Sequence, residues 1–323
     1  MKKKILIAGG GGFIGGHLAN FYQKKGYDTI SVDIKKKNHW FQINPQVKNI
    51  EGDCRDPVIC DRITKGVDYI FNLACNMGGM GFIENNKALC MLSGVININL
   101  LNSSKKNKIK KFFYSSSACV YPSYRQKDYK HPQLKETDAY PADPEDGYGW
   151  EKLFNERMCR HFYEDFGLET RVARYHNVYG EFGSWKDGRE KAPAALARKF
   201  VEAIDKKKNK IEIWGDGRQI RSFLYIDDCI RGTDKLFKSN YRNPINIGND
   251  KHVTINGLVS ILEKITGHQM KRQYDKSKPK GVNSRSSNNT LVKKTLNWSP
   301  KISTSEGMKK LYQFVKTEYY KKK

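Results

Sequence analysis

A glycine-rich turn near the start of the chain constrains its fold more than any other feature. The apolar run in KKILIAG, residues 3–9, predicts a buried strand, and a helical pattern over residues 13–25 follows at once. Between them stand Gly9, Gly12 and Gly15 in the spacing GxxGxxG. Glycines here permit a tight turn and close approach of backbone to a pyrophosphate, and the helix N-terminus supplies free N–H groups. The pattern therefore predicts a strand–turn–helix unit that binds a dinucleotide.

The end of the second predicted strand, DTISVD, indicates which dinucleotide is expected. Asp33 can accept hydrogen bonds from ribose hydroxyls, and its charge repels a 2′-phosphate, which favours NAD over NADP. Lys35–Lys37 follow closely and keep NADP open as an alternative. We predict NAD as the cofactor, with Phe13 and Ile14 of the turn also at its binding site.

Short apolar runs alternate with helical patterns through the first half of the chain. Strands are predicted for residues 68–74 and for KKFFYSS and ETRVARY, and helices for residues 84–105 and 148–166. Such alternation builds βαβ units around a parallel sheet, with right-handed crossovers. We therefore predict an α/β protein of the Rossmann type, with a doubly wound parallel sheet.

The pattern loosens after residue 178, where glycine, proline and charged residues are frequent. Further helices are predicted near residues 191–205, 227–238, 255–266 and 304–320. The segment NPINIGN, residues 243–249, is predicted to return to the main sheet as a strand. We expect an NAD-binding domain over residues 1–178, with a return segment near residues 222–249, and a smaller C-terminal substrate-binding lobe over residues 179–323.

Composition narrows the class of protein. The formal net charge is +25, but the lysines are scattered and no basic-aromatic motif organises them, so a solvated surface or an anionic substrate explains them better than nucleic acid. No apolar run approaches the roughly 20 residues that span a bilayer. The apolar run near the N-terminus is also too short for a signal peptide. The 7 cysteines form no CxxC pair and no zinc spacing. We expect a cytoplasmic protein with free thiols and no metal, nucleic-acid or membrane partner.

A tyrosine and a lysine stand four residues apart in YGWEK, as Tyr148 and Lys152. On the predicted helix this spacing places both on one face. A neighbouring ammonium stabilises a phenolate and lowers its pKa from about 10, and a phenolate can remove a hydroxyl proton while hydride leaves for nicotinamide. Ser117, in the serine cluster SSSACVYP, is expected to bind the same substrate oxygen.

Together these motifs resemble the extended short-chain dehydrogenase/reductase family of nucleotide-sugar epimerases, dehydratases and reductases, and the resemblance covers nearly the whole chain. It implies that Asp53 in EGDCRD lies on the adenine side of the cofactor, that Ala74 in FNLA ends a strand against the cofactor, and that Arg221 in WGDGRQIRSFLYIDD contacts a nucleotide diphosphate. It also implies a homodimer, because residues 84–105 and 148–166 are similar to the helix pair that forms a four-helix interface in the family.

Within this family, three stretches are similar to the GDP-mannose 3,5-epimerases: NLACNMGGMGFIENN, SSSACVYP and GEFGSWKDGREKAPAA. A cysteine and a lysine form the acid/base pair in those enzymes, and they match Cys119 and Lys191. The other positions that match substrate contacts are Gly78, Ser117, Ala118, Asn177, Glu190, Ala192, Lys199, Gln219, Arg221 and Arg285. The resemblance implies an NAD-dependent isomerase that binds GDP-mannose or a close relative.

Two acid/base groups suit the chemistry that the resemblance implies. Oxidation of a hexose at C4 acidifies the protons on C3 and C5. Inversion removes a proton from one ring face and returns one to the other, so one rigid group cannot do both. An adjacent cation lowers the pKa of a thiol, and desolvation lowers that of a lysine. We expect Cys119 and Lys191 to approach the sugar from opposite sides.

Several alternatives stay open. An enzyme like GDP-fucose synthase, a 3,5-epimerase and 4-reductase using NADP, carries a similar cysteine but a histidine in place of Lys191. A 4-epimerase or 4,6-dehydratase does not need Cys119, and an NAD or sugar-nucleotide sensor does not need Ser117, Tyr148 and Lys152. The exact sugar is left open by four departures from the family pattern: Cys75, Asn76, Glu181 and Ile220. Inversion at C3, C5 or both also stays open. The residues expected to be structural are His176, Cys54, Cys60, Cys90, Cys159 and Cys229.

Overall fold

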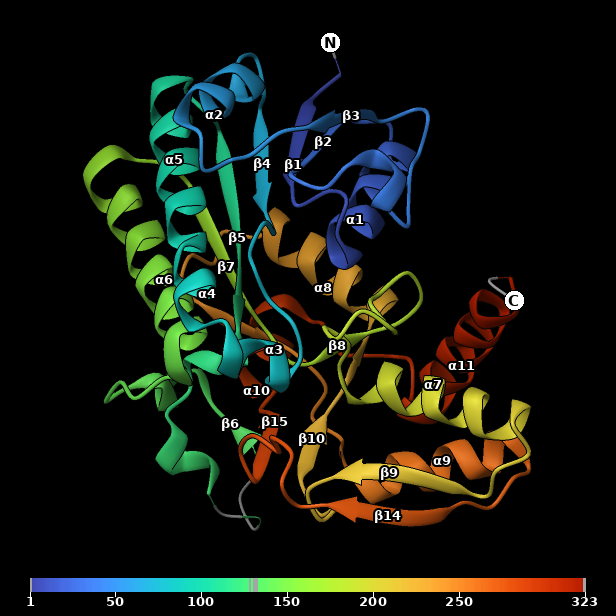
Figure 1. Cartoon of the computed structure of the whole chain (residues 1–323). Helices are drawn as coiled ribbons and strands as arrows, with labels where there is room; N and C mark the ends of the chain where they lie inside the picture. The colour runs from blue at the N-terminus through green and yellow to red at the C-terminus, as the bar shows by residue number, and fades with distance from the viewer. Residues whose placement is uncertain (1, 128, 130–132, 322–323) are drawn as a thin grey trace.

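Seven parallel strands form the central sheet of the computed structural model, which describes residues 2–127, 129 and 133–321 (Figure 1). Across the sheet they are β3 (Lys48–Glu51), β2 (Asp28–Asp33), β1 (Lys4–Ala8), β4 (Tyr69–Asn72), β5 (Lys111–Ser117), β7 (Thr170–Tyr175) and β12 (Ile245–Ile247). Every neighbouring pair is parallel. Strand order reverses between β1 and β4, so a binding crevice is expected at their carboxyl ends. The predicted Rossmann-type α/β fold is confirmed.

Helices cover both faces of this sheet because side chains alternate along its strands. Ile5 and Ile7 of β1 point into one core, with α1 (Phe13–Lys24) and α8 (Ile226–Lys238). Leu6 and Ala8 point into the other core. That second face is covered by α2 (Pro57–Thr64), α5 (Ser93–Lys106) and α6 (Asp146–Phe166). Continuous apolar strands of this kind are typical of a sheet buried on both sides.

The single helix predicted over residues 84–105 is wrong. The chain forms three helices there: α3 (Met80–Asn85), α4 (Lys87–Met91) and α5. Asn86 leaves the helical region, with φ −136° and ψ 44°, and its side-chain amide donates to the Phe82 carbonyl over 2.9 Å. Asparagine competes with backbone hydrogen bonding in this way, which breaks a helix that its apolar spacing favours.

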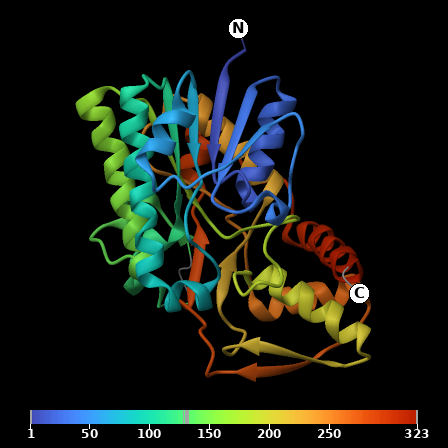
Figure 2. The same ribbon diagram turned by 45° about the horizontal axis from the view of Figure 1, so that its top comes forward.

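A smaller C-terminal lobe lies below the central sheet in Figure 1, and the turned view of Figure 2 shows the same separation. One sheet contains β13 (His252–Thr254), β10 (Ile220–Ser222), β15 (Ser284–Ser287) and β6 (Gln133–Leu134). Two strand pairs accompany it: β14 (Lys271–Asp275) with β9 (Lys210–Trp214), and β11 (Leu224–Tyr225) with β8 (Val178–Tyr179). Its helices are α7 (Ala192–Asp205), α9 (Ile255–Thr266) and α11 (Thr304–Tyr320), whereas α10 (Thr290–Leu296) contacts β12 of the central sheet. The chain crosses between the two parts repeatedly, since β6 precedes α6 whereas β12 returns to the central sheet.

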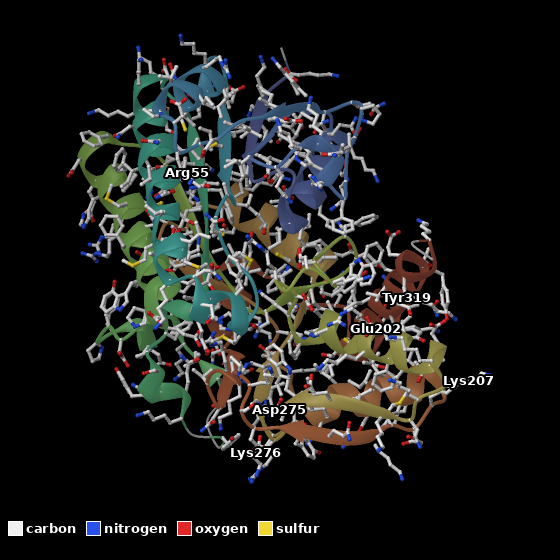
Figure 3. All side chains as sticks on the ribbon, in the orientation of Figure 1. Arg55, Glu202, Lys207, Asp275, Lys276 and Tyr319 are labelled. Atoms are coloured by element: carbon white, nitrogen blue, oxygen red, sulfur yellow. The ribbon has the colours of Figure 1, made fainter. Side chains whose placement is uncertain are left out.

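Charged side chains spread over the outside of both parts. Figure 3 shows Lys207 and Lys276 at the outer edges of the C-terminal lobe, and both are exposed. No helix in the described part of the chain combines the length and hydropathy that crossing a bilayer requires.

Candidate active site

The turn between β1 and α1 leaves room only for glycine at two positions. Gly9 has a φ of +83°, and a Cβ there would lie 2.8 Å from the backbone nitrogen of Ala74, just after β4. A Cβ on Gly15 would lie 2.1 Å from the Gly9 carbonyl oxygen. This bare backbone at a helix N-terminus fits the pyrophosphate of a dinucleotide. The start of α1 carries the other predicted cofactor residues of the turn: Gly12, Phe13 and Ile14.

The two aspartates predicted to face the adenosine half differ in their surroundings. Asp33, at the end of β2, accepts from the Lys35 backbone N–H over 3.0 Å, and the Lys35 ammonium donates to the Gly11 carbonyl over 2.6 Å. Lys35 is thereby held against the glycine turn. The guanidinium of Arg55 donates hydrogen bonds to both carboxylate oxygens of Asp53 over 2.6 to 3.0 Å. If Asp53 binds the adenine side of the cofactor, Arg55 must therefore give up some or all of its hydrogen bonds to this carboxylate.

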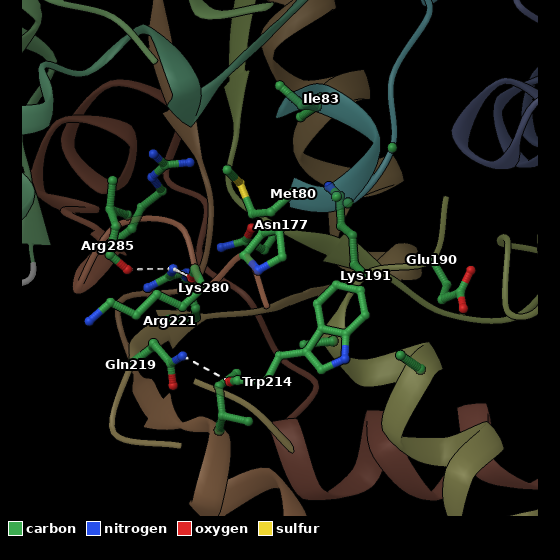
Figure 4. Close-up of a pocket in the computed structure, with 18 of the residues that line it drawn as sticks. Met80, Ile83, Asn177, Glu190, Lys191, Trp214, Gln219, Arg221, Lys280 and Arg285 are labelled. Atoms are coloured by element: carbon green, nitrogen blue, oxygen red, sulfur yellow. Dashed lines mark hydrogen bonds between the residues drawn. The ribbon is translucent and has the colours of Figure 1, made fainter. Parts of the chain in front are cut away.

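A cavity of about 260 Å³ is lined by residues from the carboxyl edge of the central sheet and from the C-terminal lobe (Figure 4). Its lining contains every predicted substrate contact: Gly78, Ser117, Ala118, Cys119, Asn177, Glu190, Lys191, Ala192, Lys199, Gln219, Arg221 and Arg285. Tyr148 also lines it, whereas Lys152 is buried and does not. Segments far apart in the sequence thus meet at one site.

Ser117, Cys119 and Tyr148 lie together because two elements end at the cavity. β5 ends at Ser117, whose hydroxyl accepts from the Cys119 N–H over 3.2 Å and caps the short helix η2 (Ala118–Val120). At the start of α6, the Glu145 N–H donates to the Cys119 carbonyl over 2.9 Å. A Cβ on Gly149 would lie 2.4 Å from that same carbonyl oxygen, so only glycine lets α6 approach this closely. Ser117, Cys119 and Tyr148 thus all line the cavity.

Lys152 is buried beside Tyr148, and a carboxylate compensates its charge. Its ammonium lies 5.3 Å from the centre of the Tyr148 ring and 3.2 Å from Glu151 Oε2. It also donates to the Tyr114 hydroxyl over 3.3 Å and is hydrogen-bonded to Cys75. Burial acts to lower the pKa of Lys152, but Cys75 and Glu151 hold it above its ordinary value. The lysine therefore keeps its charge.

Burial outweighs any lowering of the Tyr148 pKa by the nearby ammonium of Lys152. Burial raises the pKa of Tyr148 well above 10, the charges of Cys75, Cys119 and Glu151 raise it further, and the hydrogen bond with Ser117 offsets only part of this. The ammonium of Lys152 faces Glu151 at 3.2 Å, so its positive charge is not available to the phenol alone.

The predicted effect of an adjacent cation on the pKa of Cys119 is present, but burial and a nearby carboxylate outweigh it. The guanidinium of Arg285 donates to Cys119 Sγ over 3.2 Å. Burial and the charge of Glu145 nevertheless raise the pKa of the Cys119 thiol to about 11. Arg285 pairs with Glu145 at 2.7 Å, which offsets its effect on the sulfur. Cys119 is therefore a thiol rather than a thiolate at neutral pH.

Lys191 reaches the same cavity from the N-cap of α7 (Figure 4). Its ammonium makes no hydrogen bond or ion pair with the residues that the structure describes. Burial lowers the pKa of Lys191 and the charge of Arg285 contributes, while Cys119 acts in the opposite direction. A lysine with a lowered pKa and no carboxylate partner can serve a ligand as a base.

The part of the cavity next to β10 carries uncompensated positive charge. Arg221 donates to three backbone carbonyl oxygens at 2.6, 2.8 and 3.3 Å, and no carboxylate in the described ranges pairs with it. Burial and the charge of Arg285 lower the pKa of Arg221 to about 10. Such a positive potential attracts an anionic ligand.

Two buried polar atoms on the cavity wall have no hydrogen-bond partner among the described residues: Glu190 Oε2 and Gln219 Oε1. The other carboxylate oxygen of Glu190 forms an ion pair with Arg198, and the amide nitrogen of Gln219 donates to the Trp214 carbonyl over 3.1 Å. Because an unpaired buried polar atom costs about 1–3 kcal/mol, these two mark places that a ligand can complete. Lys199 is instead paired with Glu212 at 2.9 Å.

Comparison with known proteins shows the family. Residues 5–248 match the model of the NAD dependent epimerase/dehydratase family. The chain belongs to this family. It is 42% identical to GDP-mannose 3,5-epimerase 1 of Oryza sativa subsp. japonica over 100% of this chain and 84% of that protein. It is also 42% identical to GDP-mannose 3,5-epimerase of Arabidopsis thaliana, over 99% of this chain and 84% of that protein.

Solved structures of epimerases share the whole fold. UDP-glucose 4-epimerase of Thermotoga maritima, solved with UDP-glucose, has a TM-score of 0.88 at 26% identity, covering 98% of this chain and 99% of that one. UDP-glucuronic acid 4-epimerase of Bacillus cereus, solved with UDP-glucuronic acid and NAD, has a TM-score of 0.80 at 26% identity, covering 98% and 100%. The chain is an NAD-dependent nucleotide-sugar epimerase, an isomerase. The predicted family, enzyme class and cofactor are confirmed.

The cavity of this epimerase is also lined by residues that sequence reasoning misses, among them Met80, Glu145, Trp214 and Lys280. Glu145 carried a usable signal, because it stands three residues before Tyr148 on the segment that enters α6. Trp214 lies at the start of WGDGRQ, directly before the Arg221 segment. Met80 lies within NLACNMGGMGFIENN, whereas Lys280 lies outside the motifs, so only the folded chain shows the place of Lys280.

His176 does not line the epimerase cavity. It is fully buried, and its Nε2 lies 2.9 Å from Asn246 Oδ1. Burial lowers the pKa of His176 to about 3, so the ring is neutral at ordinary pH. This placement agrees with the structural role predicted for it.

Proposed function

We propose that this epimerase is a GDP-mannose 3,5-epimerase. One observation carries the proposal: Cys119 and Lys191, from different parts of the fold, line the same cavity as Ser117 and Tyr148. A 4-epimerase needs only the last two residues, because it acts on a single hydroxyl-bearing carbon. The 42% identity to proteins with this activity supports the proposal.

The hydroxyl at C4 is handled by Ser117, Tyr148 and Lys152. Tyr148 takes the hydroxyl proton, Ser117 holds the same oxygen, and Lys152 stabilises the charged phenolate from behind. The cofactor site contains Gly9, Gly12, Gly15 and Asp33, with Ala74 beside them. NAD held there would supply a reversible hydride acceptor for the oxidation at C4.

The ring protons are handled by Cys119 and Lys191. Once C4 is a ketone, a proton leaves C3 or C5 and the electron pair is held as an enolate. One of the two side chains removes this proton, and the other returns a proton to the opposite face. Their attachment to η2 and to α7 supports approach from two sides of the sugar.

The nucleotide half of the substrate is held by cations on the cavity wall. Arg221, which has no carboxylate partner among the described residues, suits a diphosphate, and Lys199, Gln219 and Arg285 lie around the same wall. Arginine and lysine bind phosphate oxygens through charge-assisted hydrogen bonds. We propose that residues 1–178 and the returning β12 hold the cofactor, while residues 179–323 hold most of the substrate, in a cytoplasmic enzyme.

We also propose that the enzyme is a homodimer. Helices α4, α5 and α6 contact one another and present large apolar side chains to solvent. These exposed side chains are Met91, Leu92, Val95, Trp150 and Phe154, with 38% to 53% of their surface accessible. A second copy that packs the same helices against them buries this patch without any further partner.

The test is turnover of GDP-mannose with NAD in D₂O, followed by NMR. Deuterium is expected at C3 and C5, with inverted products and no added reductant. Exchange at neither carbon, with inversion at C4 alone, would replace the proposal with a 4-epimerase. Net consumption of NADPH with each product would instead favour the 3,5-epimerase and 4-reductase.

A further inference from the structure

Strand β9 presents two side chains to the cavity that have no role in the function so far. Glu212 and Trp214 stand two residues apart on this strand, and the alternating residues Ile211 and Ile213 are buried. Because successive side chains of a strand point to opposite faces, Glu212 and Trp214 project from the same face. Both line the cavity, and Figure 4 shows the indole of Trp214 among the side chains around it.

Hydrogen bonds fix the Glu212 carboxylate and leave one of its oxygens open. Oε2 accepts from the Lys199 ammonium over 2.9 Å and from the Trp214 indole N–H over 3.1 Å. Lys199 also donates to the Glu212 carbonyl over 2.9 Å, so the ammonium is held beside the carboxylate. No described residue donates a hydrogen bond to Oε1, and the side chain is 45% exposed. The bond from Lys199 lowers the pKa of Glu212, so the group is charged and can only accept.

The indole of Trp214 provides a flat apolar surface next to this carboxylate. The side chain is 41% exposed, and the residue that approaches its ring from α3 is Gly81, which has no side chain of its own. Aromatic side chains bind nucleobases by stacking, and they do so with every base because each base has a π-face. Trp214 can therefore hold a base but cannot select one.

Selection among bases comes from the edge that a base presents for hydrogen bonding. Guanine presents two adjacent donors, N1–H and the 2-amino group, beside the acceptor O6. The carboxylate of Glu212 is complementary to the two donors, and the ammonium of Lys199 is complementary to O6. Uracil instead presents one N–H between two carbonyl oxygens, which a carboxylate repels. Adenine and cytosine place a ring-nitrogen acceptor where guanine has N1–H.

We propose that Glu212 and Lys199 form a guanine-reading site, with Trp214 as the surface on which the base stacks. This inference rests on the proposed function, in which the substrate is a GDP-sugar, and it names the side chains that select its base. The site is connected to the diphosphate end of the cavity. Gln219 donates to the Trp214 carbonyl over 3.1 Å and directly precedes β10, the strand that carries Arg221.

The experiment compares three nucleoside diphosphates by calorimetry with the NAD-loaded enzyme at constant salt: GDP, IDP and UDP. IDP lacks only the 2-amino group of GDP, whereas UDP keeps the ribose and diphosphate and changes the base. The parent is expected to bind GDP at least about tenfold more tightly than IDP or UDP, because loss of a partner for a charged group is costly. Glu212→Ala should make the affinities for GDP and IDP nearly equal. The variant should fold, since a partly exposed ion pair contributes little to stability.

Two further variants separate base reading from a general effect on the lobe. Trp214→Ala should weaken all three nucleotides by a similar factor, on the order of 10, and Trp214→Phe should restore much of the loss. The matched control is Asp275→Ala on β14. Asp275 is paired in register with Trp214 but does not line the cavity, so its removal should leave all three affinities unchanged.

Equal affinities of the parent for GDP and IDP, or an unchanged GDP-to-IDP ratio in folded Glu212→Ala, overturn the inference. The parent measurement needs no variant, so the test stands even if Glu212→Ala fails to fold. Deuterium exchange of GDP-mannose tests the proposed function separately. A guanine preference that depends on Glu212, without ring exchange, keeps the base site and rejects the 3,5-epimerase. Exchange by a parent that binds GDP, IDP and UDP equally does the reverse.

Discussion

The ammonium of Lys152 lies 3.2 Å from the carboxylate of Glu151, and both side chains are 2% exposed. The ammonium of Lys152 lies 5.3 Å from the centre of the Tyr148 ring, and neither Lys152 nor Glu151 lines the cavity. Glu151 also accepts from the Tyr114 hydroxyl over 3.0 Å and from the Asn155 amide over 2.7 Å. The lysine of the YxxxK motif is thus held by a buried polar network rather than by solvent.

Removal of Glu151 alone should therefore destabilise the enzyme. Glu151→Gln leaves the Lys152 charge buried without its partner, and we expect a loss of about 3 kcal/mol in the free energy of unfolding by urea. The double variant Glu151→Gln with Lys152→Met should lose less, because no uncompensated charge remains. Glu164→Gln, which breaks an exposed pair with Arg160 on the same helix, should cost under about 1 kcal/mol. An equal cost for Glu151→Gln and Glu164→Gln would show that the buried pair does not hold α6.

A methyl group at Gly15 should remove NAD binding. The added Cβ of Gly15→Ala meets the Gly9 carbonyl 2.1 Å away, so the turn must open to accept it. We expect NAD affinity, measured by calorimetry, to fall at least about tenfold, or 1.4 kcal/mol. Gly94→Ala in α5 is the control, since its Cβ meets nothing closer than 3.8 Å. Unchanged NAD affinity in Gly15→Ala would show that the turn adapts.

The fold was largely predictable because its strongest patterns are local. The glycine turn and the apolar runs of β1, β4, β5 and β7 predicted a parallel sheet, and these strands lie at its centre. β3 escaped prediction because it is an edge strand, KNIE, with no fully buried residue and hence no apolar run. The break at Asn86 escaped because a side-chain hydrogen bond, rather than the apolar spacing, decides it.

The residues that line the site could be predicted from the sequence, but their pKa values could not. Motif matches identified residues from Gly78 to Arg285 that line one cavity. The protonation of Cys119 depends on burial and on Glu145, which only the folded chain brings to the thiol. Likewise, burial and the nearby charges of Cys75, Cys119 and Glu151 raise the pKa of Tyr148, where the motif alone predicted a lowered one. Spacing reports which residues are near one another, whereas a pKa also depends on what else is buried with them.

A charge in the exposed apolar patch of α4, α5 and α6 should separate the proposed dimer. Phe154 is 51% exposed, and Phe154→Glu places a carboxylate at the expected interface without disturbing the core. We expect it to sediment as a monomer at micromolar concentration while the parent sediments as a dimer. Val58→Glu on α2, a site 73% exposed and outside the patch, should remain dimeric. A parent that sediments as a monomer removes the dimer proposal.

Acid should destabilise the enzyme partly through His176. Burial holds the pKa of His176 at about 3 in the folded chain, against about 6.5 when unfolded. Between these values the unfolded chain binds more protons, so stability rises with pH and is lost as pH falls from about 6.5 toward 3. The slope from this one group approaches 1.4 kcal/mol per pH unit. Urea unfolding from pH 7 to pH 4 should show a flatter dependence for His176→Gln than for the parent, whereas the exposed His39→Gln should match the parent.

Cys119 and Lys191 should act on carbon acids, while Tyr148 and Lys152 act on the hydroxyl that is oxidised. Cys119→Ala should still bind GDP-mannose, because the cations of the nucleotide wall remain. It should lose deuterium exchange at C3 and C5 by a factor on the order of 100 or more, the usual scale for a general acid–base group. Tyr148→Phe should abolish exchange as well, since no ketone forms to acidify the ring protons. Cys90→Ala is the matched control: it packs in the same cluster as Cys119 but does not line the cavity, and should keep the parent rate. If Cys119→Ala exchanges ring protons as fast as Cys90→Ala, the cysteine of SSSACVYP only fills space.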